Sequence, residues 1–176
     1  MKMQPKELLK VLLFDEAIVE KTKISLRNGF LSLLLVSFVF VIPTEFNITL
    51  YAWSKNFITV LALFFVLLFL IFLLCRLLGG TIKFKDFFGK VNFFLGMSLI
   101  LISVPAFFIA SAITHLIKNP TLNLALFSLI PYYTYIFFGW LCKENSKIKG
   151  LRAILFALIS MTIIFIFHYS LRFITV

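Results

Sequence analysis

The acidic side chains of this sequence all lie outside its long apolar runs, and this placement limits the chemistry available to the chain. The seven acids are Glu7, Asp15, Glu16, Glu20, Glu45, Asp86 and Glu144. Proton relays, ion pumps and intramembrane proteases use ionisable groups inside the hydrocarbon, where such groups are costly and mark function. The runs hold no carboxylate pair, no zinc-binding acid cluster and no nucleophile with its base. We therefore expect no catalytic residue, no metal site, no bound cofactor and no enzymatic activity.

Histidine and cysteine offer the remaining candidates for metal or redox chemistry. His115 and His168 each fall near the end of a long apolar run, where a pair could bind a metal or respond to pH. No third ligand accompanies them, so we favour two ordinary histidines at the membrane interface. Cys75 and Cys142 end two other runs. Acylation is the functional alternative for such cysteines, and we favour simple apolar packing.

The stretch at residues 76–90 is the one place where the chain combines charge, glycine and apolar periodicity. Gly79 and Gly80 are expected to end a helix, because glycine adopts positive φ without a clash at Cβ. Phe84 and Phe87 then begin an apolar side at helical spacing, while lysines occupy the opposite side. We predict a basic connector helix that lies on the membrane between two spanning helices.

Two stretches of the chain carry the basic residues for which we expect a binding role. They are predicted to share one side of the membrane, where each lysine or arginine is attracted to anionic headgroups by about 1 kcal/mol. The competing interpretation is that they only fix the orientation of the spans. The candidates are Arg76, Lys83, Lys85, Lys90, Lys143, Lys147 and Lys149.

The elements that must position these residues are long apolar helices. The chain has 176 residues, of which 62% are hydrophobic and 24 are phenylalanine, and a soluble domain could not cover so much apolar surface. Runs of about 20 apolar residues cross roughly 30 Å of hydrocarbon as helices, whereas barrel strands would alternate apolar and polar residues. We therefore predict an all-α integral membrane protein with five transmembrane helices. The spans are expected at about 26–43, 57–78, 91–115, 121–142 and 151–174.

Residues 1–27 are expected to form a cytoplasmic amphipathic N-terminal segment ahead of the transmembrane domain at 28–176. Lys10 interrupts the first apolar cluster of the segment, which therefore lacks the uninterrupted core of a signal peptide. We predict two short helices, the second capped by Asp15, that lie on the membrane with their apolar side down. A loosely ordered tail is the alternative.

The first span is the shortest. Only residues 29–42 are continuously apolar, so the helix must recruit residues 24–28 or continue beyond Pro43 to cross the bilayer. In the segment that follows, Trp53 suits the aromatic belt at the membrane interface. The glycosylation pattern that begins at Asn47 is interpreted as a chance match.

The basic residues divide unevenly among the segments between the spans. The segments that share a side with the N-terminus hold 14 of the 17 lysines and arginines, and the opposite side holds Lys55, Lys118 and Arg172. Basic loops remain in the cytoplasm, so we predict a cell-membrane protein with a cytoplasmic N-terminus and an external C-terminus. The same division explains the net charge of +10 without a nucleic-acid partner.

Two prolines and two rows of small residues predict how the spans are shaped and packed. Pro105 and Pro131 are expected to break the third and fourth spans, since proline removes a backbone donor but is tolerated in membrane helices. Small residues allow helix backbones to approach closely, which predicts contact between spans three and five. The rows are Ser103, Ala106 and Ala110 in span three, and Ala153, Ala157 and Ser160 in span five.

Several short motifs follow one another in a characteristic order within residues 10–170. They are Arg-Leu-Leu-Gly-Gly at 76–80 with Phe-Lys-Asp-Phe at 84–87, Trp-Leu-Cys-Lys-Glu at 140–144, and Gly-Leu-Arg-Ala-Ile at 150–154. With five spans and a proline in the third, this order resembles the Yip family of Ypt/Rab-interacting membrane proteins, most closely its prokaryotic branch. The resemblance implies a five-span membrane protein without enzymatic activity. Eukaryotic members recruit small GTPases, but this chain lacks their long polar N-terminal region and their Asp-Leu-Tyr-Gly-Pro segment.

Two functions are compatible with these features. The first is a membrane scaffold or trafficking factor with a basic cytoplasmic face, whose partners would be membrane lipids, a protein at that face or a second copy of the chain. The alternative is a small permease or lipid-handling subunit, with a pocket for an apolar or zwitterionic solute near Pro105 and Pro131. Dimerisation would supply the second repeat that such a carrier needs.

Overall fold

The protein is built from α-helices, and within the described residues no strand forms. The computed structural model describes residues 5–41 and 50–174. A short apolar helix, α3 (Leu26–Val41), precedes four helical rods that are long and apolar enough to cross a membrane. The rods are α4 (Leu50–Leu77), the continuous run of α5, η1 and α6, then α7 (Pro120–Ser146) and α8 (Leu151–Ile174). The predicted all-α membrane protein is therefore confirmed.

Two short helices lie ahead of this bundle. They are α1 (Pro5–Leu12) and α2 (Glu16–Lys21). The carboxylate of Asp15 accepts a hydrogen bond from the N–H of Ala17 at 3.1 Å, which satisfies one of the free donors at the start of α2. The predicted helix pair and its N-cap are both confirmed.

Helix α3 has 16 residues, which amounts to about 24 Å of helix. It begins beside α5, where Gly29 approaches Gly89. It ends beside the start of α4, where the rings of Phe38 and Trp53 lie 5.6 Å apart. The predicted end of this span at Pro43 and the glycosylation pattern at Asn47 lie outside the described residues.

The third rod begins earlier than the sequence predicts. α5 (Phe84–Ser98), the π-helix η1 (Leu99–Ser103) and α6 (Val104–Leu116) form one continuous run of 33 residues. The prediction of a separate connector helix on the membrane is therefore wrong. The reason is packing: Phe84 contacts three phenylalanine rings of α4, so protein rather than lipid covers the apolar side at the start of α5.

The two prolines affect their helices differently. Ahead of Pro105 the α-helical pattern gives way to η1, and the proline then stands in the first turn of α6. Proline lacks a backbone donor and clashes with the carbonyl four residues earlier, and the wider π-turn relieves that clash. Helix α7 stays α-helical through Pro131, so the break predicted there does not form.

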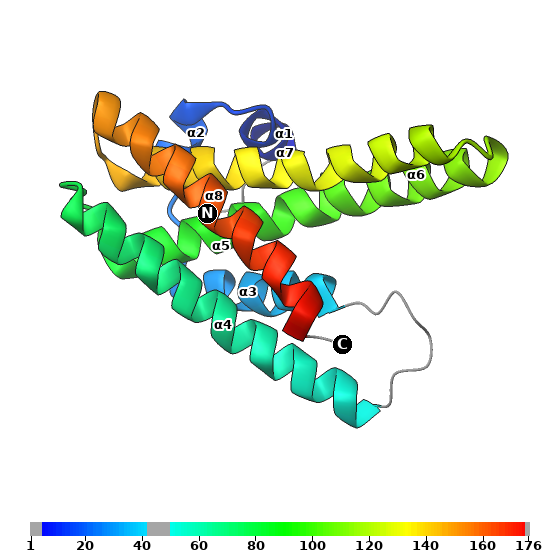
Figure 1. Cartoon of the computed structure of the whole chain (residues 1–176). Helices are drawn as coiled ribbons and strands as arrows, with labels where there is room; N and C mark the ends of the chain where they lie inside the picture. Colours follow the sequence, from blue (N-terminus) through cyan, green and yellow to red (C-terminus); the bar gives the residue numbers. More distant parts are fainter. Residues whose placement is uncertain (1–4, 42–49, 175–176) are drawn as a thin grey trace.

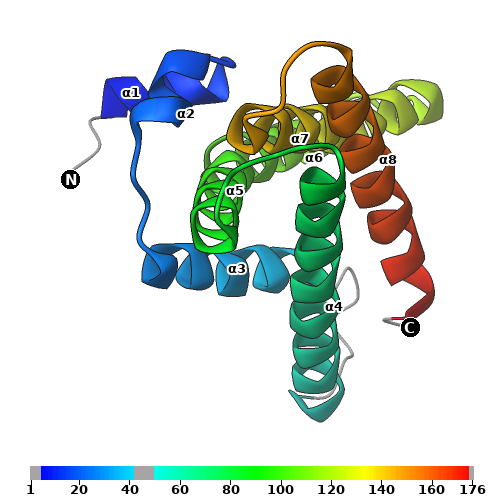
Figure 2. The same ribbon diagram turned by 90° about the vertical axis from the view of Figure 1, so that its left-hand side faces the viewer.

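The rods converge at one end of the molecule and diverge at the other (Figure 1). α4 ends, α5 begins, α7 ends and α8 begins at the shared end, whereas the α6–α7 hairpin extends away from the far ends of α4 and α8 (Figures 1 and 2). The seven basic residues with a predicted binding role lie at or beside these four helix ends. We call this part of the molecule the basic end.

Helix α5 lies at the centre of the fold, with α3 and α7 packed on it. Its crossing with α3 is close, because a Cβ on Gly29 would lie only 2.5 Å from the Cα of Gly89. One to two turns further on, a Cβ on Gly96 would lie 3.2 Å from the Cβ of Ser32. Such close approach of backbones supplies the packing that holds membrane helices together.

The two rows of small residues both pack against α7. Ser103 shares a hydrogen bond with Thr134 of α7 at 3.0 Å. On the other side, a Cβ on Gly139 of α7 would lie 2.7 Å from the carbonyl oxygen of Ala157 in α8. The predicted direct packing of spans three and five is therefore replaced by packing of each on α7.

Candidate functional site

The connector between α4 and α5 ends α4 through its two glycines. Gly79 has φ +93°, and its N–H donates to the carbonyl of Arg76 at 3.1 Å. The N–H of Gly80 donates to the carbonyl of Cys75 at 2.8 Å. This pair of bonds is a Schellman cap, so the helix end predicted at Gly79 and Gly80 is confirmed.

Arg76 folds over the same connector. Its Nη1 donates to the carbonyl of Gly80 at 3.1 Å, and its guanidinium carbon lies 5.5 Å from the ring centroid of Phe72, within cation–π range. Phe84 meets the same ring edge-on at 5.1 Å, and Phe87 is fully buried. Arg76, Phe84 and Phe87 therefore stabilise the turn and fix α5 to α4.

The N-terminal segment is docked on the bundle rather than lying free on the membrane. Val11 and Val19 are fully buried in a cluster with Phe94 of α5 and with Phe137 and Leu141 of α7. The apolar side of α1 and α2 therefore packs against protein. The prediction that this side faces lipid is wrong for these residues.

Two side chains of the bundle hold the segment through its backbone carbonyls. The partly buried Lys90 donates from Nζ to the carbonyls of Val19 at 2.8 Å and Glu20 at 3.1 Å, and so satisfies acceptors in the last turn of α2. The hydroxyl of Tyr133 donates to the carbonyl of Leu12, the last residue of α1, at 2.9 Å. Lys90 thus belongs to an internal contact and not to an open basic surface.

Lys143 is also engaged within the protein. Its Nζ lies 2.8 Å from the carboxylate of Glu144 and 3.8 Å from that of Glu16 in α2. Partly exposed ion pairs of this kind contribute little stability, but the second one joins the N-terminal segment to the end of α7. Arg76, Lys90 and Lys143 therefore serve the internal contacts of the protein.

Four of the predicted basic residues remain open at the basic end. Their side chains are exposed and form no hydrogen bond or ion pair with another residue of the described ranges. Open lysines of this kind can contact anionic groups directly. They are Lys83, Lys85, Lys147 and Lys149.

The outward face of α1 is a second exposed surface, which sequence reasoning missed, and it lies beside the middle of α7, where Tyr133 bonds the carbonyl of Leu12. Lys6, Leu9, Lys10 and Leu13 fall at helical spacing and are exposed, the two leucines to 60% and 71%. A row of lysines and leucines suits the level of lipid headgroups, with the leucines directed toward the acyl chains. The spacing was visible in the sequence, but only the docked position shows which side of α1 stays open.

The cysteines and histidines occupy unrelated environments. Cys75 and Cys142 are fully buried in one apolar cluster, as expected for simple packing. His168 of α8 is hydrogen-bonded to Tyr135 of α7, whereas His115 lines a pocket on the α6–α7 hairpin. No group of three or more potential metal ligands gathers in the part of the chain that the structure covers.

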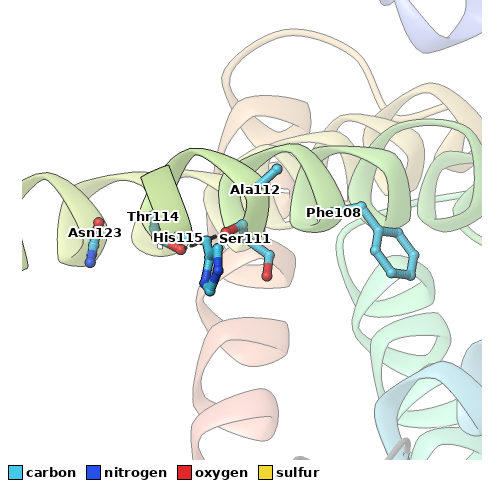
Figure 3. Close-up of a pocket in the computed structure, with 6 residues that line it drawn as sticks. All are labelled: Phe108, Ser111, Ala112, Thr114, His115 and Asn123. Carbon is cyan, nitrogen blue, oxygen red and sulfur yellow. Dashed lines mark hydrogen bonds between the residues drawn. The ribbon is translucent and has the colours of Figure 1, made fainter. Parts of the chain in front are cut away.

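A shallow pocket of about 540 Å³, open over most of its extent, lies toward the tip of the α6–α7 hairpin (Figure 3). A pocket was predicted near Pro105 and Pro131. The lining instead begins one turn beyond Pro105, at Phe108, and on α7 it includes Asn123, which lies two turns before Pro131. The full lining is Phe108, Ser111, Ala112, Thr114, His115 and Asn123.

No protein-family model, curated protein or solved structure matches this chain. The candidate sites are therefore defined by the geometry of the chain itself. They are the four open lysines at the basic end, the outward face of α1 beside α7, and the pocket of the α6–α7 hairpin.

Proposed function

We propose that this protein is a non-enzymatic membrane scaffold whose basic end binds anionic lipid headgroups at the cytoplasmic face of the cell membrane. The observation that carries the proposal is the group of four exposed lysines without a described partner, on two connectors and the first turn of α5 at one end of the bundle. Each lysine near an anionic surface contributes about 1 kcal/mol, so the four together contribute about 4 kcal/mol at low salt. Screening reduces this attraction as the ionic strength rises.

The outward face of α1 supports the same mode of binding. Its exposed leucines would enter the acyl region while its lysines stay at the phosphates. Lys90 and Tyr133 hold the segment by backbone carbonyls. The face is therefore already ordered before it meets lipid, and the entropic cost of binding is reduced.

The proposal includes the orientation of the chain in the membrane. The excess of basic residues at one end favours a cytoplasmic basic end, with the N-terminus inside and the C-terminus outside. Kinship with the Yip family remains part of the same proposal and implies no enzymatic role. A protein partner at the basic end, or a second copy of the chain, is the competing occupant of the surface.

Lipid co-purification tests the proposal. Protein carrying Lys83→Gln and Lys85→Gln is reconstituted in mixed phosphatidylglycerol and phosphatidylcholine vesicles, and the lipids retained after detergent extraction are quantified. We expect the retained ratio of phosphatidylglycerol to phosphatidylcholine to fall about 30-fold, since two lysines contribute about 2 kcal/mol. Lys55→Gln with Lys118→Gln is the matched control, because it removes the same charge from exposed lysines away from the basic end.

Two outcomes would contradict lipid binding at the basic end. One is an equal retained ratio in the basic-end and control variants. The other is an unchanged ratio together with the loss of protein crosslinks from native membrane, which would assign the lysines to a protein partner. Correct insertion of both variants is expected, because 12 of the 14 basic residues on the predicted cytoplasmic side remain in the basic-end variant.

A further inference from the structure

The turn between α1 and α2 contains a backbone conformation that is unusual for its residue. Phe14 has φ +66°, in the left-handed region that residues with a side chain rarely adopt. The N–H of Phe14 donates to the carbonyl of Val11 at 2.9 Å, and the N–H of Asp15 donates to the carbonyl of Lys10 at 3.0 Å. These two bonds form a Schellman cap, in which glycine is the usual residue at the position of Phe14. The cap that ends α1 therefore carries strain that a glycine would avoid.

The side chain of Phe14 explains what the strained turn achieves. Its ring meets three aromatic rings of α7 edge-on. The centroid distances are 5.1 Å to Trp140, 5.7 Å to Phe137 and 6.1 Å to Tyr133. Edge-to-face contacts at such distances stabilise aromatic pairs beyond the burial of their area. A glycine at this position would remove the strain but would lose all three contacts, so the ring of Phe14 fixes the turn to α7.

Residues 5–21 depend on docking for their helical structure. Helices α1 and α2 have 8 and 6 residues, which is too short for a stable isolated helix in water. Lys90 and Tyr133 bond to carbonyls in the last turns of α2 and α1, and Val11 and Val19 are buried against the bundle. A single non-helical stretch, residues 22–25, joins the segment to α3 (Figure 2). The segment can therefore leave the bundle without breaking a helix.

We propose that residues 5–21 form a releasable strap, anchored by Phe14, over an interaction surface for an amphipathic helix. The docked strap shows the chemistry that this surface accepts: an apolar helix face, together with helix C-terminal carbonyls that meet Lys90 and Tyr133. A partner segment of that chemistry binds when the strap leaves, and the strain at Phe14 favours its departure. The inference does not depend on lipid binding at the basic end. The covered surface consists of Phe94, Tyr133, Phe137, Trp140 and Leu141.

Alanine and glycine at position 14 separate the ring from the strain. Phe14→Ala removes the ring but keeps the strain, whereas Phe14→Gly removes both. The rate of amide hydrogen exchange at residues 5–21 is measured by mass spectrometry on the full-length protein in micelles. Both variants should exchange faster than wild type, and the glycine variant should exchange about fivefold more slowly than the alanine variant, because glycine adopts positive φ without strain. At the exposed helical position 9 the order should reverse, since glycine destabilises a helix relative to alanine.

The exchange experiment also shows whether the strap moves independently of the bundle. We expect residues 84–116 to keep their wild-type exchange rates in both variants at position 14. Equal rates at residues 5–21 in the alanine and glycine variants would overturn the role of strain in release. Faster exchange throughout residues 84–116 would overturn the strap itself, because the segment would then be an inseparable part of the bundle.

A peptide added to the full-length protein tests the covered surface. The probe is a fluorescent peptide of residues 5–25, and its binding to protein in micelles is followed by anisotropy. The concentration for half-saturation should be at least tenfold lower with Phe14→Ala protein than with wild type, whose intact strap competes with the peptide. The control peptide carries Val11→Asp and Val19→Asp, which leaves the outward face of α1 unchanged but places charge at two buried positions. Equal binding of the two peptides, or equal binding of the probe to both proteins, would overturn the proposal.

Discussion

Replacement of Gly80 by alanine should destabilise the basic end more than the same change at Gly79. A Cβ on Gly80 would collide with Sγ of Cys75 and would lie 2.8 Å from the carbonyl oxygen of Cys75 and 3.0 Å from that of Ser146. The two carbonyls belong to the backbone of α4 and α7 and cannot move without opening both helix ends. Overpacking of this kind costs about 1–3 kcal/mol, and we expect a value near 3 kcal/mol here.

Gly79→Ala is the matched control, because its cost has a different cause. A Cβ on Gly79 would meet nothing within 4 Å, but the φ of +93° strains any residue with a side chain. A left-handed conformation costs about 1–2 kcal/mol, so we expect roughly 1 kcal/mol for this variant. The free energy of unfolding is measured by denaturation with dodecyl sulfate in mixed micelles, followed through tryptophan fluorescence.

A double-mutant cycle with Cys75→Ala separates these two causes. Removal of Sγ relieves part of the collision at Gly80. The destabilisation caused by Gly80→Ala should therefore be smaller in the Cys75→Ala background, with a coupling free energy of at least about 1 kcal/mol. The strain at Gly79 does not involve the sulfur atom, so the changes in the free energy of unfolding caused by Cys75→Ala and Gly79→Ala should be additive. Additive effects at 75 and 80, or equal costs for the two glycine variants, would refute the packing described for the connector.

Two further variants test contacts elsewhere in the bundle. Lys90→Met should release the N-terminal helices, because it removes both hydrogen bonds to α2. The rate of amide hydrogen exchange at residues 5–21 should then be at least tenfold higher than in a Lys85→Met control. Equal exchange rates in the two variants would count against the docking. Gly139→Ala should push α7 from α8, because its Cβ would lie 2.7 Å from the carbonyl oxygen of Ala157. The free energy of unfolding should fall by about 1–3 kcal/mol, and a wild-type value would show that the contact is looser than described.

Local features of the fold were predictable because short stretches of sequence determine them. The apolar runs identified the long helices, although the exact ends differ. Asp15 caps α2 as expected, and Gly79 with Gly80 ends α4 as expected. Caps and helix ends depend on residues within one or two turns, so no tertiary information is needed to find them.

Contacts between distant segments were not predictable from periodicity. The hydrogen bond from Lys90 to the carbonyl of Val19 joins residues that are 71 positions apart in the chain. The hydrogen bond from Tyr133 to the carbonyl of Leu12 joins residues that are 121 positions apart. An apolar helix face can be covered by lipid or by protein, and lipid tails are as apolar as leucine. The sequence therefore showed that α1 and α2 have an apolar side, but not that the bundle covers much of it. For the same reason it could not separate the engaged Lys90 from the open Lys85.

A pocket was predicted near Pro105 and Pro131, but the pocket in the structure lies nearer the tip of the α6–α7 hairpin. At Pro105 the backbone adjusts through the π-turn η1, and the proline is not among the residues that line the pocket described above. The lining depends instead on how α6 and α7 pair near their connection. That pairing follows from tertiary packing, which the spacing of Ser111, His115 and Asn123 along the chain does not reveal.

The central claim is that all five apolar helices cross the bilayer, including the short α3, with the basic end in the cytoplasm. It is tested most directly by labelling single introduced cysteines in intact cells with a membrane-impermeant maleimide; the native cysteines are buried and contribute little background. We predict labelling of Lys55→Cys and Lys118→Cys, and protection of Lys10→Cys and Lys149→Cys until the cells are permeabilised. If Lys10→Cys and Lys55→Cys react alike in intact cells, α3 does not cross the membrane and the five-span account is contradicted.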